Sequence, residues 1–329
     1  MTREEKKKLK EEEKRIKAIN NSLSYLSKEM QEELGVVSIQ KDEGAYYCGN
    51  GVCKRIYMFQ PYSLGNKRIA FIKAITDRFN NRIRFTMCTK NREGSFTAYM
   101  FMTVFFEADS YFEAKKLIAD FENTLIKDIC VFLDISIQPC SIDNTLTYIH
   151  MNCSGEMSKI STDVLFSNKN GGIKLIDGIS NCNAGSFNIH DRYGKVFIGK
   201  NYERKTNGIN DFIRKNNGTY YIVVDFQGYT EDEQRLFNSE LKARYGYRNN
   251  VETPHLINMS YFLTITGETE DIVTETSENM IAHYDKNGIQ LMPGVGREAD
   301  IVRSCCSLGL VDFHSGQNVT CEIVGGLLL

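Results

Sequence analysis

The chain has 329 residues, a size that typically forms about two domains rather than one hydrophobic core. Apolar residues make up 42% and charged residues 25%, as in a soluble globular protein, and the net charge of −2 excludes a general electrostatic attraction to nucleic acid or acidic membranes. No stretch reaches the roughly 20 apolar residues of a membrane span. The charged N-terminus has no apolar core of a signal peptide, so a cytoplasmic location is predicted.

The ten cysteines are predicted to be reduced, as is usual in the cytoplasm. None belongs to a C-x-x-C pair, and the closest candidates are Cys48 with Cys53 and the adjacent Cys305 and Cys306. Zinc sites typically need paired ligands at tighter spacing. We therefore expect buried thiols and no structural metal.

Residues 3–34 are predicted to form one charged helix. Its apolar residues recur at spacings of three and four, which forms a heptad seam about two heptads long. The seam consists of Ile16, Ile19, Leu23, Leu26 and Met30. Such a helix either packs on its own domain or binds a partner or a second copy of the chain.

Residues 35–149 are predicted to form a first α+β lobe. Asn50 between Gly49 and Gly51 is typical of a hairpin turn, and Ser110 with Glu113 forms a capping box that begins a helix. Strands are expected at 36–40, 45–49, 52–60, 82–89, 99–106 and 133–138, and helices at 67–80 and 110–129. From Val52 to Gln138 the order is β-α-β-β-α-β, which is the ferredoxin-like order.

The same order recurs after a hairpin-rich linker at 150–194, which is rich in Asn, Ser and Gly. In the second lobe, residues 195–329, strands are expected at 195–198, 220–226, 257–265 and 289–291, and helices at 209–213, 230–247, 269–287 and 297–308. The helix at 230–247 is an addition relative to the first lobe. The predicted fold class is α+β, with two ferredoxin-like lobes in tandem behind an N-terminal charged helix at 1–34.

One segment approaches a phosphate-binding motif. Gly194 to Asn201 fits G-x-x-x-x-G-K but ends in Asn, where a P-loop has the Ser or Thr that holds Mg²⁺. Val196, Phe197 and Ile198 favour a strand, whereas a phosphate cradle is a tight loop. The five histidines are scattered without metal-ligand spacing, and Asp134 and Asp225 each stand alone on a strand. No catalytic residue, metal or cofactor is predicted.

The strongest local signal is charge, because ten basic residues and a single acid lie between Lys54 and Arg92. We expect a basic docking face for an acidic protein surface or for the anionic inner leaflet of a membrane. Its predicted members are Lys54, Arg55, Arg68, Arg78, Arg82 and Arg84. Alternatively, Tyr57 and Phe59 stack on the bases of a nucleic acid, as in RNA-recognition modules, although the RNP1 pattern of those modules is missing.

Residues 34–90 resemble the start of the conjugal-transfer ATPases of Gram-positive type IV secretion systems, the TraE/TraC-type family. The resemblance lies in an order of features: the acidic-glycine turn 42–44, the basic and aromatic strand 53–59, the helix 67–80 that ends in Phe-Asn, and the strand that begins at Arg82. Residues 281–308 resemble the part of that family with a helix, then Gly288-Ile-Gln-Leu291, then a second helix.

The resemblance implies a role without catalysis. Members of that family carry Walker motifs in a C-terminal motor, and no such motif occurs in this chain. We therefore expect the N-terminal domain alone, which in the family docks the motor onto the inner-membrane channel. The expected partners are channel or ATPase subunits, with peripheral membrane association and self-association through the N-terminal helix as further expectations. A nucleic-acid-binding module remains the alternative.

Overall fold

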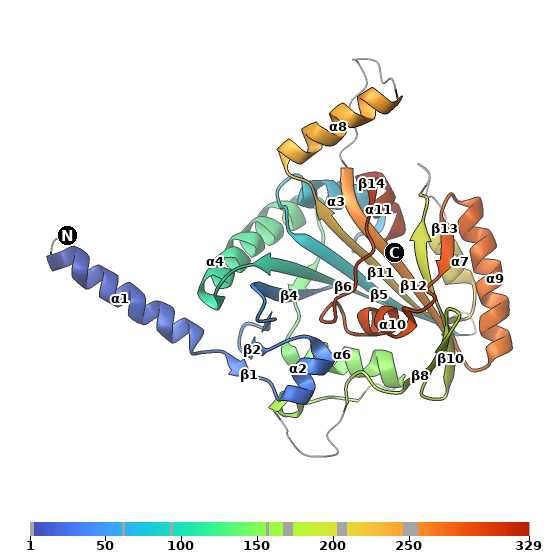
Figure 1. Ribbon diagram of the computed structural model, residues 1–329, viewed down its shortest axis with the longest axis horizontal. Coiled ribbons are helices and arrows are strands. Elements are labelled where there is room, and N and C mark those ends of the chain that lie inside the picture. The colour runs from blue at the N-terminus through green and yellow to red at the C-terminus, as the bar shows by residue number, and fades with distance from the viewer. Residues whose placement is uncertain are drawn as a thin grey trace.

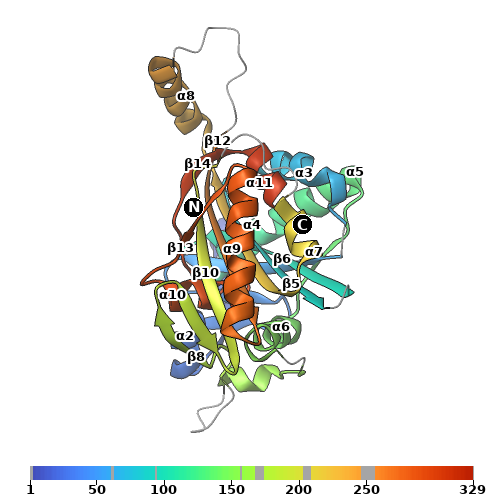
Figure 2. The same cartoon turned by 90° about the vertical axis from the view of Figure 1, so that its right-hand side faces the viewer.

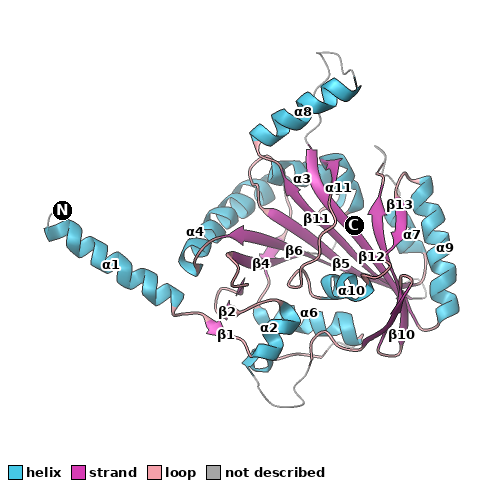
Figure 3. Ribbon diagram, viewed as in Figure 1, coloured by secondary structure: helices cyan, strands magenta, loops and turns pink. Residues whose placement is uncertain are grey.

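The structure, a computed structural model, describes residues 3–60, 63–92, 95–155, 158–166, 174–202, 209–245 and 256–328. It is an α+β protein in which one antiparallel sheet lies between helices on both faces (Figures 1 and 3). The strands are β1 (Ser24–Tyr25), β2 (Ser38–Gln40), β3 (Ala45–Tyr47), β4 (Val52–Phe59), β5 (Arg82–Arg92), β6 (Ser95–Glu107), β7 (Ile137–Pro139), β8 (Ile179–Asn183), β9 (Ser186–Ile189), β10 (Arg192–Lys200), β11 (Gly218–Gly228), β12 (Leu256–Gly267), β13 (Gln290–Pro293) and β14 (Gln317–Thr320).

Eleven α-helices are described in these ranges. They are α1 (Arg3–Asn20), α2 (Lys28–Leu34), α3 (Arg68–Thr76), α4 (Tyr111–Glu122), α5 (Val131–Leu133), α6 (Ile142–Ser154), α7 (Ile209–Lys215), α8 (Glu231–Tyr245), α9 (Glu270–Lys286), α10 (Glu298–Cys306) and α11 (Cys321–Leu327). A π-helical segment, Asn123–Cys130, continues α4 into α5, and 3₁₀ turns cover Gly65–Lys67 and Thr162–Phe166.

The sheet contains the same arrangement twice. Its main path runs β1-β2-β3-β4-β6-β5-β11-β12-β10-β9-β8, with β7 paired to β4, β13 to β10 and β14 to β12. The first half therefore has the order β7-β4-β6-β5, and the second half has the corresponding order β13-β10-β12-β11. The halves join where β5 pairs with β11, from Arg82 opposite Gln227 to Asn91 opposite Gly218.

The repetition extends beyond the β-α-β-β-α-β block that the sequence predicts. A hairpin precedes each block, β2-β3 before β4 and β8-β9 before β10, and each hairpin pairs with the strand that follows it. One helix also follows each block, α6 after β7 and α10 after β13. The described residues of the predicted linker at 150–194 therefore include the end of α6, the 3₁₀ turn Thr162–Phe166, the β8-β9 hairpin and the start of β10.

Two apolar layers enclose the sheet. One lies under α3, α4, α7, α9 and α11, and the other under α2, α6 and α10 (Figures 1 and 2). On β6, Met102 belongs to the first layer and Phe101 to the second, and both are fully buried. The strand predicted at 99–106 is thus confirmed as part of β6, and its apolar run is buried on both faces.

Several local predictions are also confirmed. The Ser110 side chain accepts a hydrogen bond from the Glu113 amide at 3.3 Å and begins α4. Gly49 and Gly51 have φ of 74° and 75° in the turn between β3 and β4, a backbone conformation that glycine adopts without strain. Residues 194–200 of the near-match to a P-loop lie within strand β10, as the run of strand-forming residues indicates, and Asn201 follows the strand.

The single helix predicted for residues 3–34 is wrong. Helix α1 ends at Asn20, β1 follows, and Ser27 caps a separate helix, α2, by accepting a hydrogen bond from the Met30 amide at 3.3 Å. Leu26 and Met30 are buried in the core beside the sheet, so they do not continue a heptad seam with the residues of α1. Burial against the sheet overrides the heptad spacing. Helix α1 extends away from the rest of the molecule (Figure 1).

Candidate functional site

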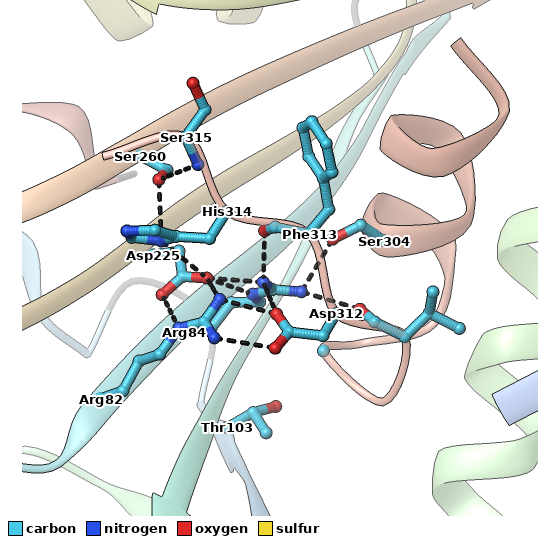
Figure 4. Close-up of polar contacts among 12 residues, drawn as sticks. Arg82, Arg84, Thr103, Asp225, Ser260, Ser304, Asp312, Phe313, His314 and Ser315 are labelled. Carbon is cyan, nitrogen blue, oxygen red and sulfur yellow. Dashed lines mark hydrogen bonds and ion pairs between the residues drawn. The ribbon is translucent and has the colours of Figure 1, made fainter. Parts of the chain in front are cut away.

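Four charged side chains form a network where the two halves of the sheet meet. Arg82 and Arg84 lie on β5, Asp225 on β11, and Asp312 on the loop after α10 (Figure 4). The Asp225 carboxylate accepts hydrogen bonds from Arg82 Nε at 2.8 Å and Arg82 Nη2 at 2.5 Å, and from Arg84 Nε at 3.0 Å and Arg84 Nη2 at 2.5 Å. Strand alternation places these three side chains on the same sheet face, since Arg84 and Asp225 are opposite each other in the β5–β11 pair.

The network keeps both carboxylates ionised. Burial alone would raise the pKa of Asp225, but Arg84 and Arg82, together with the nearby His314, hold it well below its usual range. Arg82 and Arg84 likewise outweigh burial at Asp312 and lower its pKa. Arg84 and Asp225 are both fully buried. Each therefore depends on the other, because an unpaired buried charge is strongly unfavourable.

The network also fastens the loop after α10 to the sheet. Arg84 Nη1 donates to the Val311 carbonyl at 3.0 Å and Arg84 Nη2 to the Phe313 carbonyl at 2.8 Å. Thr103 Oγ1 on β6 donates to the Leu308 carbonyl at 2.5 Å. Gly309 has φ of +90°, and a Cβ there would lie 3.0 Å from Thr103 Oγ1, so a glycine suits this close approach.

A pocket of about 530 Å³ opens beside this network. Its charged lining residues are Lys54, Arg82, Glu107 and Asp312. Amide side chains form most of the remaining polar lining, namely those of Asn50, Asn80, Asn81 and Gln227. The volume falls within the range of about 300–1,000 Å³ that is typical of small-molecule sites. This pocket and the buried network below it form the candidate functional site.

The predicted basic face does not form as one exposed surface. Lys54, Arg55 and Arg84 are buried, with exposed fractions of 4%, 8% and 0%. Arg55 contacts Glu122 at 3.2 Å, and Lys54 and Arg84 belong to the site described above. Strands β4 and β5 are central in the sheet and covered on both faces, which is why their basic side chains point into the molecule rather than outward.

The other three members of the predicted face differ in their surroundings. Arg82 is largely buried in the network, Arg68 donates to the Leu328 carbonyl, and Arg78 is exposed and forms an ion pair with Asp128 at 3.3 Å.

Tyr57 and Phe59 are buried, with exposed fractions of 0% and 3%. Phe59 packs edge-on against Phe71, and the Tyr57 hydroxyl donates to Glu122 at 3.1 Å. Because base stacking requires an open aromatic face, these two side chains are not available for the stacking expected in the nucleic-acid alternative.

Sequence reasoning missed the acidic half of the network. Asp225 stands alone among the apolar residues of β11, and a single carboxylate in a strand buried on both faces indicates a buried cationic partner. The sequence therefore indicated that Asp225 has a cationic partner, but it did not show that the partners are Arg82 and Arg84. Asp312 lies in a segment for which the sequence predicts no element and thus gives no signal.

Within the described ranges, no group of three or more His, Cys, Asp or Glu is placed to hold a metal ion, and no helix combines the length and apolarity needed to cross a bilayer. Comparison of the chain with protein-family models and with curated proteins finds no match.

Proposed function

We propose that the chain is a non-catalytic docking component of a conjugative type IV secretion machine, which contacts the transfer ATPase and the inner-membrane channel. The proposal combines the family resemblance of residues 34–90 and 281–308 with one structural observation. That observation is a continuous, doubly covered sheet from which two helices, α1 and α8, project (Figures 1 and 2). Projecting helices on a rigid base suit the assembly of several subunits.

In this proposal the two halves are ferredoxin-like lobes. The orders β7-β4-β6-β5 and β13-β10-β12-β11, with antiparallel pairing throughout, support it, because a split β-α-β unit places its third strand between its first and second. Helix α8 lies between the second and third strands of the second lobe. It is thus an insertion into a lobe whose core does not need it.

Helix α1 is the proposed contact with partner subunits. Its side chains from residue 5 to residue 15 are exposed, including the apolar Leu9 at 50%, and it has more basic than acidic residues. The last residue of α1, Asn20, accepts a hydrogen bond from the amide of Phe112 on α4 at 3.2 Å, which holds the base of α1 to α4. A helix whose side chains are exposed along most of its length leaves that surface for a partner with acidic side chains.

Co-purification tests the proposal. The full chain is expressed with the channel and ATPase subunits of a conjugative system, alongside the charge reversal Lys7→Glu/Lys10→Glu/Lys14→Glu. The wild-type chain is expected to capture these subunits, and the triple variant is expected to lose them. Lys286→Glu, an exposed change on α9, serves as the matched control and is expected to retain binding.

Two results contradict the proposal. One is capture that the triple variant retains in full, and the other is robust ATP hydrolysis by the isolated chain that disappears in Lys200→Ala. Lys200 is the lysine of the near-match to a P-loop, and it donates to Ser315 Oγ at 3.2 Å.

A further inference from the structure

Lys54 is buried, and among the described residues its ammonium group has no carboxylate within ion-pair distance. Its side chain comes from β4 and lines the pocket beside the arginine–aspartate network. The ammonium group donates to the Leu310 carbonyl at 2.7 Å and to the Gly309 carbonyl at 3.3 Å. The nearby Asp312 carboxylate accepts its hydrogen bonds from Arg82 and Arg84 instead.

This arrangement is unfavourable unless something completes it. Lysine is among the residues least often buried, and a buried ammonium group is normally paired. Burial lowers the pKa of Lys54, and Arg84 and Arg82 lower it further, whereas the Cys48 thiol and Asp312 act in the opposite direction. Two carbonyl groups accept hydrogen bonds from the Lys54 ammonium, and the Phe105 ring lies 4.9 Å from it, so the ammonium can donate one further hydrogen bond to an anionic group.

The pocket provides space and hydrogen-bonding groups for such a ligand. Its volume of about 530 Å³ exceeds that of an isolated ion, and four side-chain amides line it. The Asn81 amide nitrogen already donates to the Phe105 carbonyl at 2.9 Å, which fixes its orientation. Glu107 is exposed at the same pocket, where it disfavours ligands of high negative charge.

We infer that this pocket binds a small ligand through an oxyanion, either a phosphate or a carboxylate group, with Lys54 as its counter-ion. The amide side chains hold the uncharged part of the ligand. Arg82, which lines the pocket and is partly exposed, supplies a second cationic edge. This site is separate from the docking role proposed for α1, and neither depends on the other.

Titration of the full chain with two probes tests the inference. Inorganic phosphate and sodium acetate are titrated separately at constant ionic strength of about 0.15 M, because salt screens charge interactions. Binding is followed by calorimetry and by the NMR signals of the side-chain amides of Asn50 and Asn81. Saturable binding of phosphate alone assigns a phosphate site, and binding of acetate alone assigns a carboxylate site. The absence of saturable binding of either probe at 10 mM, an order-of-magnitude limit for a weak site, would overturn the inference.

Two variants give opposite expected results. Lys54→Met keeps the length of the side chain and removes its charge, so the affinity is expected to fall about tenfold or more. Asp312→Asn removes a negative charge beside the site and releases a donor group of Arg82, so the affinity is expected to rise. Lys73→Met, an exposed change on α3, is the control and is expected to bind as the wild type does.

Each variant is first checked for folding by circular dichroism. Unchanged affinity in folded Lys54→Met contradicts the inference, and so does unchanged or weaker binding in Asp312→Asn. If Lys54→Met does not fold, the Asp312→Asn variant and the amide signals of the wild type decide the question.

Discussion

Replacing Asp225 with Asn tests whether the buried network holds the two halves together. The substitution keeps the size of the side chain but removes the charge that accepts four hydrogen bonds from Arg82 and Arg84. Arg84 would remain fully buried with Asp312 as its only carboxylate partner among the described residues. Removing one partner of a buried pair costs about 3–5 kcal/mol. We expect a loss near 3 kcal/mol, since Asp312, Ser304 and two carbonyl groups still bind Arg84.

Urea denaturation, monitored by circular dichroism, measures this loss as a change in the free energy of unfolding. Asp128→Asn is the matched control, because it removes the same charge from the exposed pair with Arg78 and should cost less than about 1 kcal/mol. A loss of less than about 1 kcal/mol in Asp225→Asn would refute the reasoning. The double variant Arg84→Met/Asp225→Leu should regain stability relative to Asp225→Asn, since it leaves no unpaired charge.

The same carboxylate predicts how stability depends on pH. The pKa of Asp225 is lower in the folded chain than its ordinary value of about 3.9. Its contribution to the free energy of unfolding is therefore complete above that ordinary pKa and is lost as the pH falls toward the folded-state value. Between about pH 4 and pH 2, wild-type stability should fall more steeply than that of Asp225→Asn. Equal slopes in the two proteins would show that folding does not lower the pKa of Asp225.

Three further predictions concern packing, thiols and backbone. Leu26→Ala should reduce the free energy of unfolding by about 2–5 kcal/mol and Leu9→Ala by less than about 0.5 kcal/mol, because only Leu26 is buried. Similar losses for the two variants in urea denaturation would support the single helix with one heptad seam. One thiol is expected to react fast with a thiol-reactive dye, because Cys182 is exposed and the other cysteines are buried or partly buried. Cys182→Ser should remove this fast reaction, and several fast-reacting thiols would contradict the structure. Gly309→Ala should lower the melting temperature more than Gly296→Ala. Both glycines have positive φ, but only a Cβ at residue 309 would meet neighbouring atoms. Equal effects of the two variants would argue against the close approach of Gly309 to Thr103.

The sequence was sufficient for elements that depend on local chemistry. The capping side chain of Ser110, the turn at Gly49 and Gly51, and the apolar run of β6 each act within a few residues, so their signals survive in the sequence. The order of strands and helices in both halves could be read for the same reason. Whether the halves form ferredoxin-like lobes remains our proposal.

What the sequence could not provide depends on contacts between distant residues. The pairing of β5 with β11 joins residues more than a hundred positions apart and has no local signature. It also explains why Arg84, predicted on an exposed face, lies in the interior, since β5 would otherwise be an edge strand. The break after Asn20 was hidden because the apolar residues on both sides of it keep helical spacing while packing on different surfaces.

The pairing of β5 with β11 has a consequence for the symmetry of the chain. Over ten residue pairs the two strands run in opposite directions, so the start of each strand faces the end of the other. A polypeptide that contained only one half would leave this strand uncovered, and an identical polypeptide could cover it with the same geometry. The two halves therefore meet within one chain as the subunits of a symmetric homodimer would. Helix α8 departs from this symmetry, because it lies between β11 and β12, whereas β5 and β6 are separated by two residues.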